Sequence, residues 1–225
     1  MNNEVTLNAK LMDKNSVEMK YDTYLIFKRF GDITISLVVV VILVPVAFLV
    51  KVANLLNKDF DKLIYKQDRI GQNGRLFTIY KFRSMRINAD EELDTILKDK
   101  NYKKEYDLNK KISDDPRITK VGSFIRKTSI DELPQVINVL KGDMSIVGNR
   151  PYLPREKDDM GIYYDNIIST KPGITGLWQT SGRNKTTFNK RLEYENYYSN
   201  NRSFMLDCKI LAKTIKTVLF DKNGK

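Results

Sequence analysis

An apolar run at residues 33–50 is the feature that most limits what this chain can fold into. Only Thr34 and Ser36 interrupt its 18 residues. As a helix it would extend about 27 Å, slightly less than the roughly 30 Å hydrocarbon core of a bilayer. Pro45 lies inside the run, where it removes one backbone hydrogen bond and bends a helix. The sequence therefore predicts a bent helix in contact with a membrane.

Positive charge flanks both ends of this run. The residues are Lys28, Arg29, Lys51, Lys58 and Lys62. Because positive flanks favour the cytoplasmic side, residues 28–58 are predicted to form a re-entrant helix that enters one leaflet and returns. A spanning helix with a tolerated proline and a buried helix of a soluble protein are the alternatives. Residues 1–27 are expected to be a flexible arm, and residues 59–225 a membrane-associated cytoplasmic domain.

Residues 203–220 have the pattern of a basic amphipathic helix. Its apolar residues follow a helical period, and three lysines fall on one face, namely Lys209, Lys213 and Lys216. Such a helix can lie in the headgroup plane of a membrane. It can equally pack on the domain with its lysines in solvent, and the sequence leaves both arrangements open.

Composition excludes several kinds of chemistry. The chain has 225 residues and no histidine, so it holds no Ser-His-Asp triad, no Cys-His dyad and no imidazole metal site. Cys208 is the single cysteine, expected in a core or against lipid, and no intramolecular disulfide is possible. The net charge of +11 indicates an anionic partner: nucleic acid, an acidic membrane or a phosphate-rich substrate. Any metal would be a hard cation held by oxygen, such as magnesium.

The part of the chain after the apolar run contains a predicted β-hairpin. Residues 63–70 and 76–82 are β-prone, and Asn73-Gly74 between them is a strong turn signal. Asn88 is placed to begin a helix that runs through Leu97. Residues 144–147 are typical of a short strand.

An acidic pair, Asp131 and Glu132, precedes a predicted amphipathic helix that ends at Gly142. The apolar positions of this helix are Leu133, Val136, Ile137 and Leu140. Pro134 must lie in the first turn, where its missing N–H has little effect. The pair then occupies a helix N-terminus, which stabilises anions. The alternative is structural, because Ser129 and Glu132 match a capping box.

Basic residues surround this pair in the sequence, several of them in loops that Gly and Pro make rigid. They are Lys81, Arg83, Arg126, Lys127, Arg150, Lys171 and Arg183. Guanidinium and ammonium groups in rigid loops suit the binding of phosphates. Each one alone is also typical of ordinary solvated surface.

From about Tyr24 to Phe220, the order of these motifs resembles that of the bacterial sugar transferases, the monotopic polyprenyl-phosphate phosphoglycosyl transferases. The motifs are YKFRSM at 80–85, DPRIT at 115–119, RKTSIDELPQ at 126–135, NVLKGDMSIVG at 138–148 and KPGITGLWQTSGR at 171–183. Two positions depart from the family pattern, because Asn149 replaces a usual proline and Val44 replaces a frequent serine. The four-helix N-terminal extension of long members is lacking, so the minimal form is expected.

The resemblance implies a fold and a mechanism. The fold is α+β and mostly helical, a monotopic membrane protein with a re-entrant N-terminal helix, a small β-hairpin and a C-terminal amphipathic helix. Asp131 would attack the β-phosphorus of a UDP-sugar, releasing UMP, and undecaprenyl phosphate would then displace the sugar phosphate from Asp131. Glu132 would bind Mg²⁺. Phosphates would be bound by Lys81, Arg83, Arg126 and Arg150, and the nucleotide sugar by a loop with Gln179 and Arg183.

The same resemblance implies partners and a location. UDP-galactose or UDP-glucose is favoured as donor, and the product would begin a capsule, exopolysaccharide or O-antigen repeat unit. The domain at 59–225 would be catalytic, facing the cytoplasm at the inner leaflet of a bacterial cytoplasmic membrane. The alternative is a non-catalytic basic protein that binds anionic lipid or nucleic acid. The apolar run and the acidic pair among basic loops argue against it, so no nucleic acid partner is expected.

Overall fold

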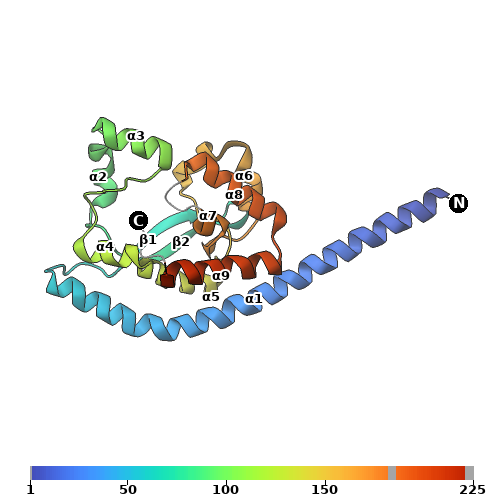
Figure 1. Cartoon of the computed structure of the whole chain (residues 1–225), viewed down its shortest axis with the longest axis horizontal. Coiled ribbons are helices and arrows are strands. Elements are labelled where there is room, and N and C mark those ends of the chain that lie inside the picture. Colours follow the sequence, from blue (N-terminus) through green and yellow to red (C-terminus); the bar gives the residue numbers. More distant parts are fainter. Residues whose placement is uncertain (1, 182–185, 221–225) are drawn as a thin grey trace.

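The structure, a computed structural model, describes residues 2–181 and 186–220, which are mostly helical with two small two-stranded sheets (Figure 1). This confirms the α+β, mostly helical class. The elements are α1 (Asn2–Leu56), β1 (Ile64–Ile70), η1 (Gln72–Gly74), β2 (Leu76–Phe82), α2 (Ala89–Ile96), α3 (Lys100–Asn109), α4 (Lys120–Lys127), η2 (Ile130–Gln135), α5 (Val136–Lys141), β3 (Ser145–Val147), η3 (Pro154–Glu156), η4 (Asp158–Tyr163), α6 (Tyr164–Ile168), β4 (Gly173–Thr175), α7 (Leu177–Ser181), α8 (Phe188–Asn201) and α9 (Phe204–Phe220).

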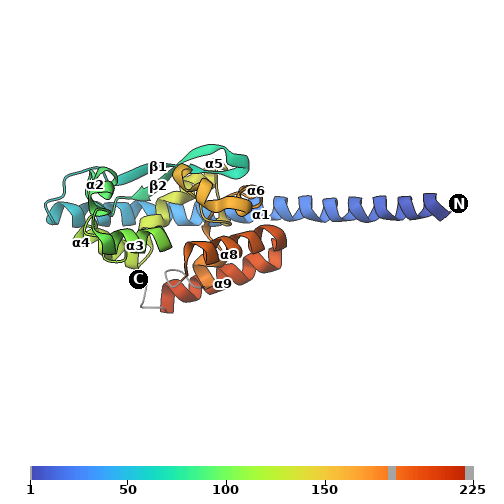
Figure 2. The same cartoon turned by 90° about the horizontal axis from the view of Figure 1, so that it is seen from above.

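Helix α1 continues through Pro45 and is curved in Figure 1. In Figure 2 it passes between the hairpin on one side and α8 and α9 on the other. The flexible arm expected at 1–27 differs from the structure, in which residues 2–27 continue the helix. No proline or glycine lies between residues 2 and 30, and each residue added to an existing helix gains a hydrogen bond. The division of the chain at residues 27 and 58 stays a prediction.

One face of α1 packs along the rest of the protein. Its buried or half-buried residues recur at helical spacing and are Lys28, Asp32, Ser36, Leu43, Ala47, Val50 and Asn54. The opposite face exposes large apolar side chains such as Phe30, Val41 and Phe48. The segment Thr23–Leu56 is long and apolar enough to cross a membrane. However, it contacts α4, α5, η2 and β3 along its length, so it lies beside the domain instead of leaving it.

Polar contacts fix the first part of this face. Asp32 accepts a hydrogen bond from the backbone N–H of Ile146 at 2.9 Å. Arg29 donates to the carbonyl oxygens of Val139 and Leu140, at 2.6 and 2.9 Å. Carbonyls in the last turn of a helix lack intrahelical partners, so Arg29 completes the C-terminus of α5.

A second polar cluster joins α1 to α9. The Lys28 ammonium lies 2.5 Å from a carboxylate oxygen of Asp207 and donates to the carbonyl of Val147 at 2.8 Å. The hydroxyls of Tyr24 and Tyr198 both donate to Asp207 at 2.9 Å. The basic flank of the apolar run therefore has a structural role that its charge alone did not indicate.

The predicted hairpin is confirmed. Strands β1 and β2 pair antiparallel from Ile70 opposite Leu76 to Ile64 opposite Phe82. Asn73 and Gly74 both have positive φ, 56° and 79°, as the turn signal required. Helix α2 begins after Asn88 as expected, although the Asn88 side chain makes no capping hydrogen bond.

Strand β3 confirms the short strand expected at 144–147, but its parallel pairing with β4 was not foreseen. The two strands approach closely because glycines flank them. A Cβ on Gly148 would lie 2.4 Å from the carbonyl oxygen of Lys171, and one on Gly173 would lie 2.1 Å from the Gly148 nitrogen. Only glycine fits such an approach. The pairing places the loop after β3 beside the loop that leads into α7.

Helix α9 packs on the domain with Ile210 fully buried in the core that also holds Val139 and Met144. Lys209 and Lys213 are exposed. The packed arrangement is therefore present, while contact of the lysines with a membrane stays a prediction. Cys208 is exposed, so the core position expected as one alternative is wrong, while contact of Cys208 with lipid stays a prediction.

Replacing Asp32 by Ala is expected to lower the free energy of unfolding by about 1–3 kcal/mol, because it leaves buried donors at Ser145 and Ile146 unpaired. Denaturant unfolding in detergent micelles measures this. Asp94→Ala, on the exposed side of α2, is the control. A loss no larger than that of the control contradicts the anchoring role.

Candidate active site

The acidic pair lies in the first turn of η2, a short 3₁₀ helix that leads directly into α5. Asp131 and Glu132 therefore occupy a helix N-terminus, as the sequence indicated. Ser129 has a left-handed φ of 57° and its side chain makes no capping hydrogen bond. The capping-box alternative is therefore wrong, and the pair needs another explanation.

The apolar face predicted for the following helix is only partly right. Val136 is buried, but Ile137 is 40% exposed and Asn138 is fully buried. Residues in a 3₁₀ turn are about 120° apart around the helix axis, compared with about 100° in an α-helix. The 3₁₀ turn therefore changes which residues of α5 face the core. The Asn138 amide donates to the Thr78 carbonyl at 2.8 Å and accepts from the Tyr80 N–H at 3.1 Å. These two bonds fasten α5 to β2.

Two cations reach the acidic pair from elements on either side. Lys81, near the end of β2, places its ammonium 3.0 Å from a carboxylate oxygen of Glu132. Arg126, in the last turn of α4, donates from Nε to the Ser84 hydroxyl at 2.9 Å. Both charges favour the ionised form of Asp131. The structure thus brings Lys81, Arg126 and the acidic pair together as the sequence predicted.

Asp131 is an unusual carboxyl because it is 9% exposed and adjacent to a second carboxylate. Burial, and next the negative charge of Glu132, raise its pKa to about 6, against the opposing effect of Lys81 and Arg126. A raised pKa from burial and a like charge is a common property of functional carboxyls. At neutral pH the group is ionised, and its environment keeps it poorly solvated.

A cluster of cations surrounds Arg150 in the loop after β3. Its charge acts on Arg69, Lys111, Arg126 and Arg191, which come from β1, the loop after α3, α4 and α8. Partial burial, then the charges of Arg126, Arg150 and Arg191, lower the pKa of Lys111 to about 8. Burial, then Arg150, lowers that of Arg69 to about 10. Cations from separate elements gathered in this way produce a positive potential that favours a polyanion.

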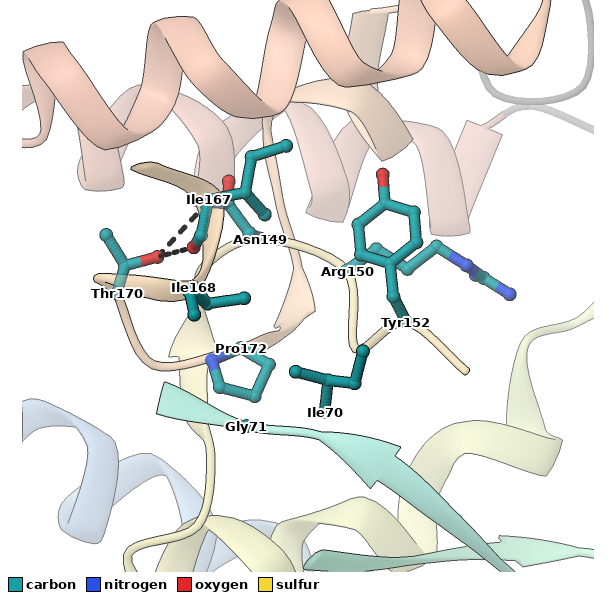
Figure 3. A pocket seen from close by; sticks show the side chains of 9 residues that line it. All are labelled: Ile70, Gly71, Asn149, Arg150, Tyr152, Ile167, Ile168, Thr170 and Pro172. Carbon is teal, nitrogen blue, oxygen red and sulfur yellow. Dashed lines mark hydrogen bonds between the residues drawn. The ribbon is translucent and has the colours of Figure 1, made fainter. Parts of the chain in front are cut away.

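A small cleft, partly open to solvent, is lined by Glu132 of the acidic pair and by Arg69 and Arg150 of this cluster. Its polar lining is Arg69, Lys81, Glu132, Gln135, Arg150 and Gln179. A second small cavity, mostly apolar, is lined by the loop of Asn149 and Arg150 together with Ile70, Ile167 and Pro172. In Figure 3 the Arg150 side chain points away from Ile70 and Pro172 in that cavity, so its guanidinium belongs to the first cleft.

Of the predicted site residues that the structure describes, Asp131, Arg83 and Arg126 are not among those that line the cleft. Arg83 donates to the carbonyls of Lys62 and Met85 and forms an ion pair with Asp59 at 2.6 Å. It therefore holds the base of the hairpin together, which corrects its expected role in phosphate binding. Arg183 lies outside the described residues.

The sequence missed Arg69, Lys111 and Arg191. No local signal marks them, because a lone basic residue in a strand, a loop or a helix is typical of surface. These three residues are distant in the sequence, and only the fold brings them close to Arg150.

The residues present fit a magnesium ion bound with a phosphate ligand. Among the described residues, no group of three or more His, Cys, Asp or Glu side chains could form a protein-only cage. Mg²⁺ usually takes only one or two protein carboxylates, with waters and substrate phosphates. Glu132, whose side chain is 30% exposed at the cleft, can supply one.

The family model described as "Bacterial sugar transferase" matches residues 23–221. The chain is 43% identical over 196 residues to the "Undecaprenyl-phosphate galactose phosphotransferase" of Salmonella typhimurium, covering 85% of this chain and 40% of that protein. It is 33% identical over 224 residues to the "UDP-glucose:undecaprenyl-phosphate glucose-1-phosphate transferase" of Escherichia coli, covering 93% and 45%. It is 37% identical over 200 residues to the "Exopolysaccharide production protein ExoY" of Sinorhizobium fredii, covering 88% of both. The chain thus spans less than half the length of the first two relatives.

Asp131→Asn is expected to stabilise the protein above pH 6. The raised pKa means that the fold favours the neutral carboxyl, so the contribution of Asp131 to stability is full below its unfolded pKa of 3.8 and is lost as pH rises through about 6. Asparagine stays neutral. The variant should therefore gain on the order of 1–3 kcal/mol over wild type at pH 7.5 and nothing near pH 4, measured by unfolding at both values.

Asp115→Asn is the matched control with the opposite sign. Although burial acts to raise it, the pKa of Asp115 is lowered by hydrogen bonds from Arg117 at 2.8 and 2.6 Å. Its ionised form stabilises the fold above its unfolded pKa, so the variant should be less stable than wild type at pH 7.5. If both variants shift stability in the same direction, the electrostatic account of Asp131 is wrong.

Proposed function

Because the chain belongs to the bacterial sugar transferase family, we propose that it transfers a sugar 1-phosphate from a UDP-sugar to undecaprenyl phosphate, with release of UMP. The observation that carries the proposal is the buried Asp131 carboxylate beside a cleft lined by cations from separate elements. The printed names of the Salmonella and Escherichia relatives support the same pair of substrates.

In the first step the Asp131 carboxylate attacks the β-phosphorus of the UDP-sugar. A bond forms between a carboxylate oxygen and this phosphorus, and the bond from the phosphorus to the bridging oxygen breaks. UMP leaves with that oxygen, and the sugar phosphate stays on Asp131. The pKa of about 6 keeps Asp131 ionised at neutral pH, and its burial leaves it weakly solvated, which favours attack.

In the second step a phosphate oxygen of undecaprenyl phosphate attacks the phosphorus held on Asp131. The bond between this phosphorus and the carboxylate breaks, which gives undecaprenyl diphosphate sugar and frees Asp131. Each step joins two anions, so both depend on cations that stabilise the developing charge.

Different residues of the site would bind the substrate phosphates and hold the metal ion. Arg69 and Arg150 line the cleft, where a diphosphate would bind, and the charge of Arg126 acts on Asp131. Lys81 holds Glu132 at the cleft at 3.0 Å. Glu132 would hold a magnesium ion, which when bound supplies further positive charge to the phosphates.

Exposed apolar side chains support a lipid-linked acceptor. Besides the outer face of α1, they include Phe124 on α4, Ile137 on α5 and Ile215 on α9. These helices lie along the lower side of the protein in Figure 1, away from α2, α3 and α6. An acceptor with its tail in the membrane and its phosphate at headgroup depth could then reach η2, which directly precedes α5. We place this surface on the inner leaflet, with the cleft facing the cytoplasm.

The donor sugar is proposed to be a hexose, galactose or glucose. The relatives are named for both sugars. Gln179 lines the cleft with its side-chain oxygen buried and without a hydrogen-bond partner, so it can accept from a sugar hydroxyl or from the nucleotide. The lipid product would begin the repeat unit of a capsule, an exopolysaccharide or an O-antigen.

Asp131→Asn is expected to reduce UMP release by at least about 10⁴-fold, because the amide cannot act as the nucleophile. The assay supplies UDP-galactose or UDP-glucose, Mg²⁺ and undecaprenyl phosphate, with Asp94→Asn as the control. Rapid acid quenching of wild type with donor alone should give a hexose-phosphate adduct on the peptide that contains Asp131. An active Asp131→Asn enzyme, or an adduct on another residue, contradicts the mechanism.

Re-entry of α1 is tested by labelling with a membrane-impermeant maleimide. In a Cys208→Ser background, a cysteine introduced by Asn3→Cys is expected to react only after cells are permeabilised, because both ends of the helix are predicted to be cytoplasmic. Pro45→Ala should straighten the helix and expose part of the population to outside label. Labelling of the Asn3→Cys protein in intact cells, with Pro45 present, would establish a spanning helix.

A further inference from the structure

Helix α8 carries a buried carboxyl that the proposed mechanism does not use. Glu195 is 2% exposed, and its Oε2 accepts a hydrogen bond from the backbone N–H of Arg150 at 2.7 Å. One turn further along α8, the Ser199 hydroxyl accepts from the Asn149 amide at 2.7 Å. The helix therefore holds two successive residues of the loop that presents Arg150.

The same helix joins this loop to two other segments of the site. Arg191, one turn before Glu195, lies with its guanidinium 4.2 Å from the centre of the Trp178 ring. It also donates to the carbonyl of Asn109 at 3.1 Å. Trp178 precedes Gln179, and Asn109 lies two residues before Lys111. Helix α8 thus positions three segments that bring polar groups to the cleft.

The buried Glu195 side chain contributes little to the stability of the fold. Burial raises its pKa to about 8, against the opposing effect of the Arg150 N–H and of the Arg191 and Arg150 charges. Its second oxygen, the Tyr152 hydroxyl and the Arg191 Nε are all buried without a partner. Unpaired buried polar atoms destabilise a fold, and apolar residues of similar volume often replace buried ionisable groups without loss. A role in the site explains Glu195 better than a role in stability.

We propose that Glu195 is a positioning residue for sugar phosphate transfer, which by accepting the Arg150 N–H fixes the loop so that the Arg150 guanidinium faces the cleft. This inference rests on the proposed function. It requires only a hydrogen-bond acceptor at this position, since the contact is to a backbone N–H.

The test compares two variants of Glu195. Glu195→Gln keeps an acceptor oxygen, so its kcat/KM for the UDP-sugar should stay within about threefold of wild type. Glu195→Met keeps the volume and removes the acceptor. Its kcat/KM should fall on the order of 10²-fold, as expected for a displaced binding group, while its unfolding temperature is unchanged or higher. Glu193→Met, on the exposed face of the same helix, is the control.

A double-mutant cycle shows whether the effect passes through Arg150. If it does, adding Glu195→Met to Arg150→Ala should change kcat/KM by less than about threefold. Additive losses, a wild-type rate for Glu195→Met, or a Gln variant as slow as the Met variant would each overturn the proposal. Unfolding of both Glu195→Met and Glu195→Leu would also overturn it, because Glu195 would then be needed for the fold.

The failure of this inference is distinguishable from failure of the proposed function. If wild type releases no UMP from UDP-galactose or UDP-glucose with undecaprenyl phosphate, the proposed function itself is wrong. If wild type is active and Glu195→Met is equally active, the reaction stands and only the role of Glu195 is lost.

Discussion

The negative charge of Asp131 is the constraint on which the rest of the structure depends. The carboxyl is buried next to a second carboxylate, so the fold favours its neutral form. Lys81 from β2 and Arg126 from α4 partly offset this. In the proposed mechanism this ionised, poorly solvated carboxylate would be reactive because it is not well stabilised, and contacts made elsewhere in the protein hold it in place. Stability and reactivity are therefore opposed at this one side chain.

Helix α1 contacts the segment that carries Asp131 through only a few residues. Arg29 binds the last carbonyls of α5, and α5 follows directly on η2, which contains Asp131. Farther along, Val50 packs against Phe82 and Ile125, next to the hairpin and α4 that supply the neighbouring cations. In the proposed membrane-bound state, the depth of α1 in the membrane would therefore set the depth of the carboxylate.

Local signals in the sequence predicted local structure well. The Asn73-Gly74 turn, the strand before Gly148 and the acidic pair at a helix N-terminus each depend on a few neighbouring residues. Contacts between distant residues were not predictable. The ion pair of Lys28 with Asp207 joins positions 179 residues apart, and the Asn138 side chain fastens α5 to Thr78 and Tyr80 about 60 positions earlier. A local sequence pattern carries no information on such pairings. The positive charge of Lys28 and Arg29 therefore predicts only a flank of the membrane segment.

The excess of positive charge did not by itself identify the phosphate-binding residues. Arg83 and Arg117 carry the same positive charge as Arg126, but each has its own carboxylate partner, Asp59 and Asp115. Around Arg150, by contrast, burial and the charge of Arg150 lower the pKa of Arg69, Lys111 and Arg191, and nearby carboxylates of Glu105, Glu156 and Glu195 offset only part of this. A diphosphate in the cleft would remove this repulsion. In the proposed function, the diphosphate of the donor would supply this negative charge.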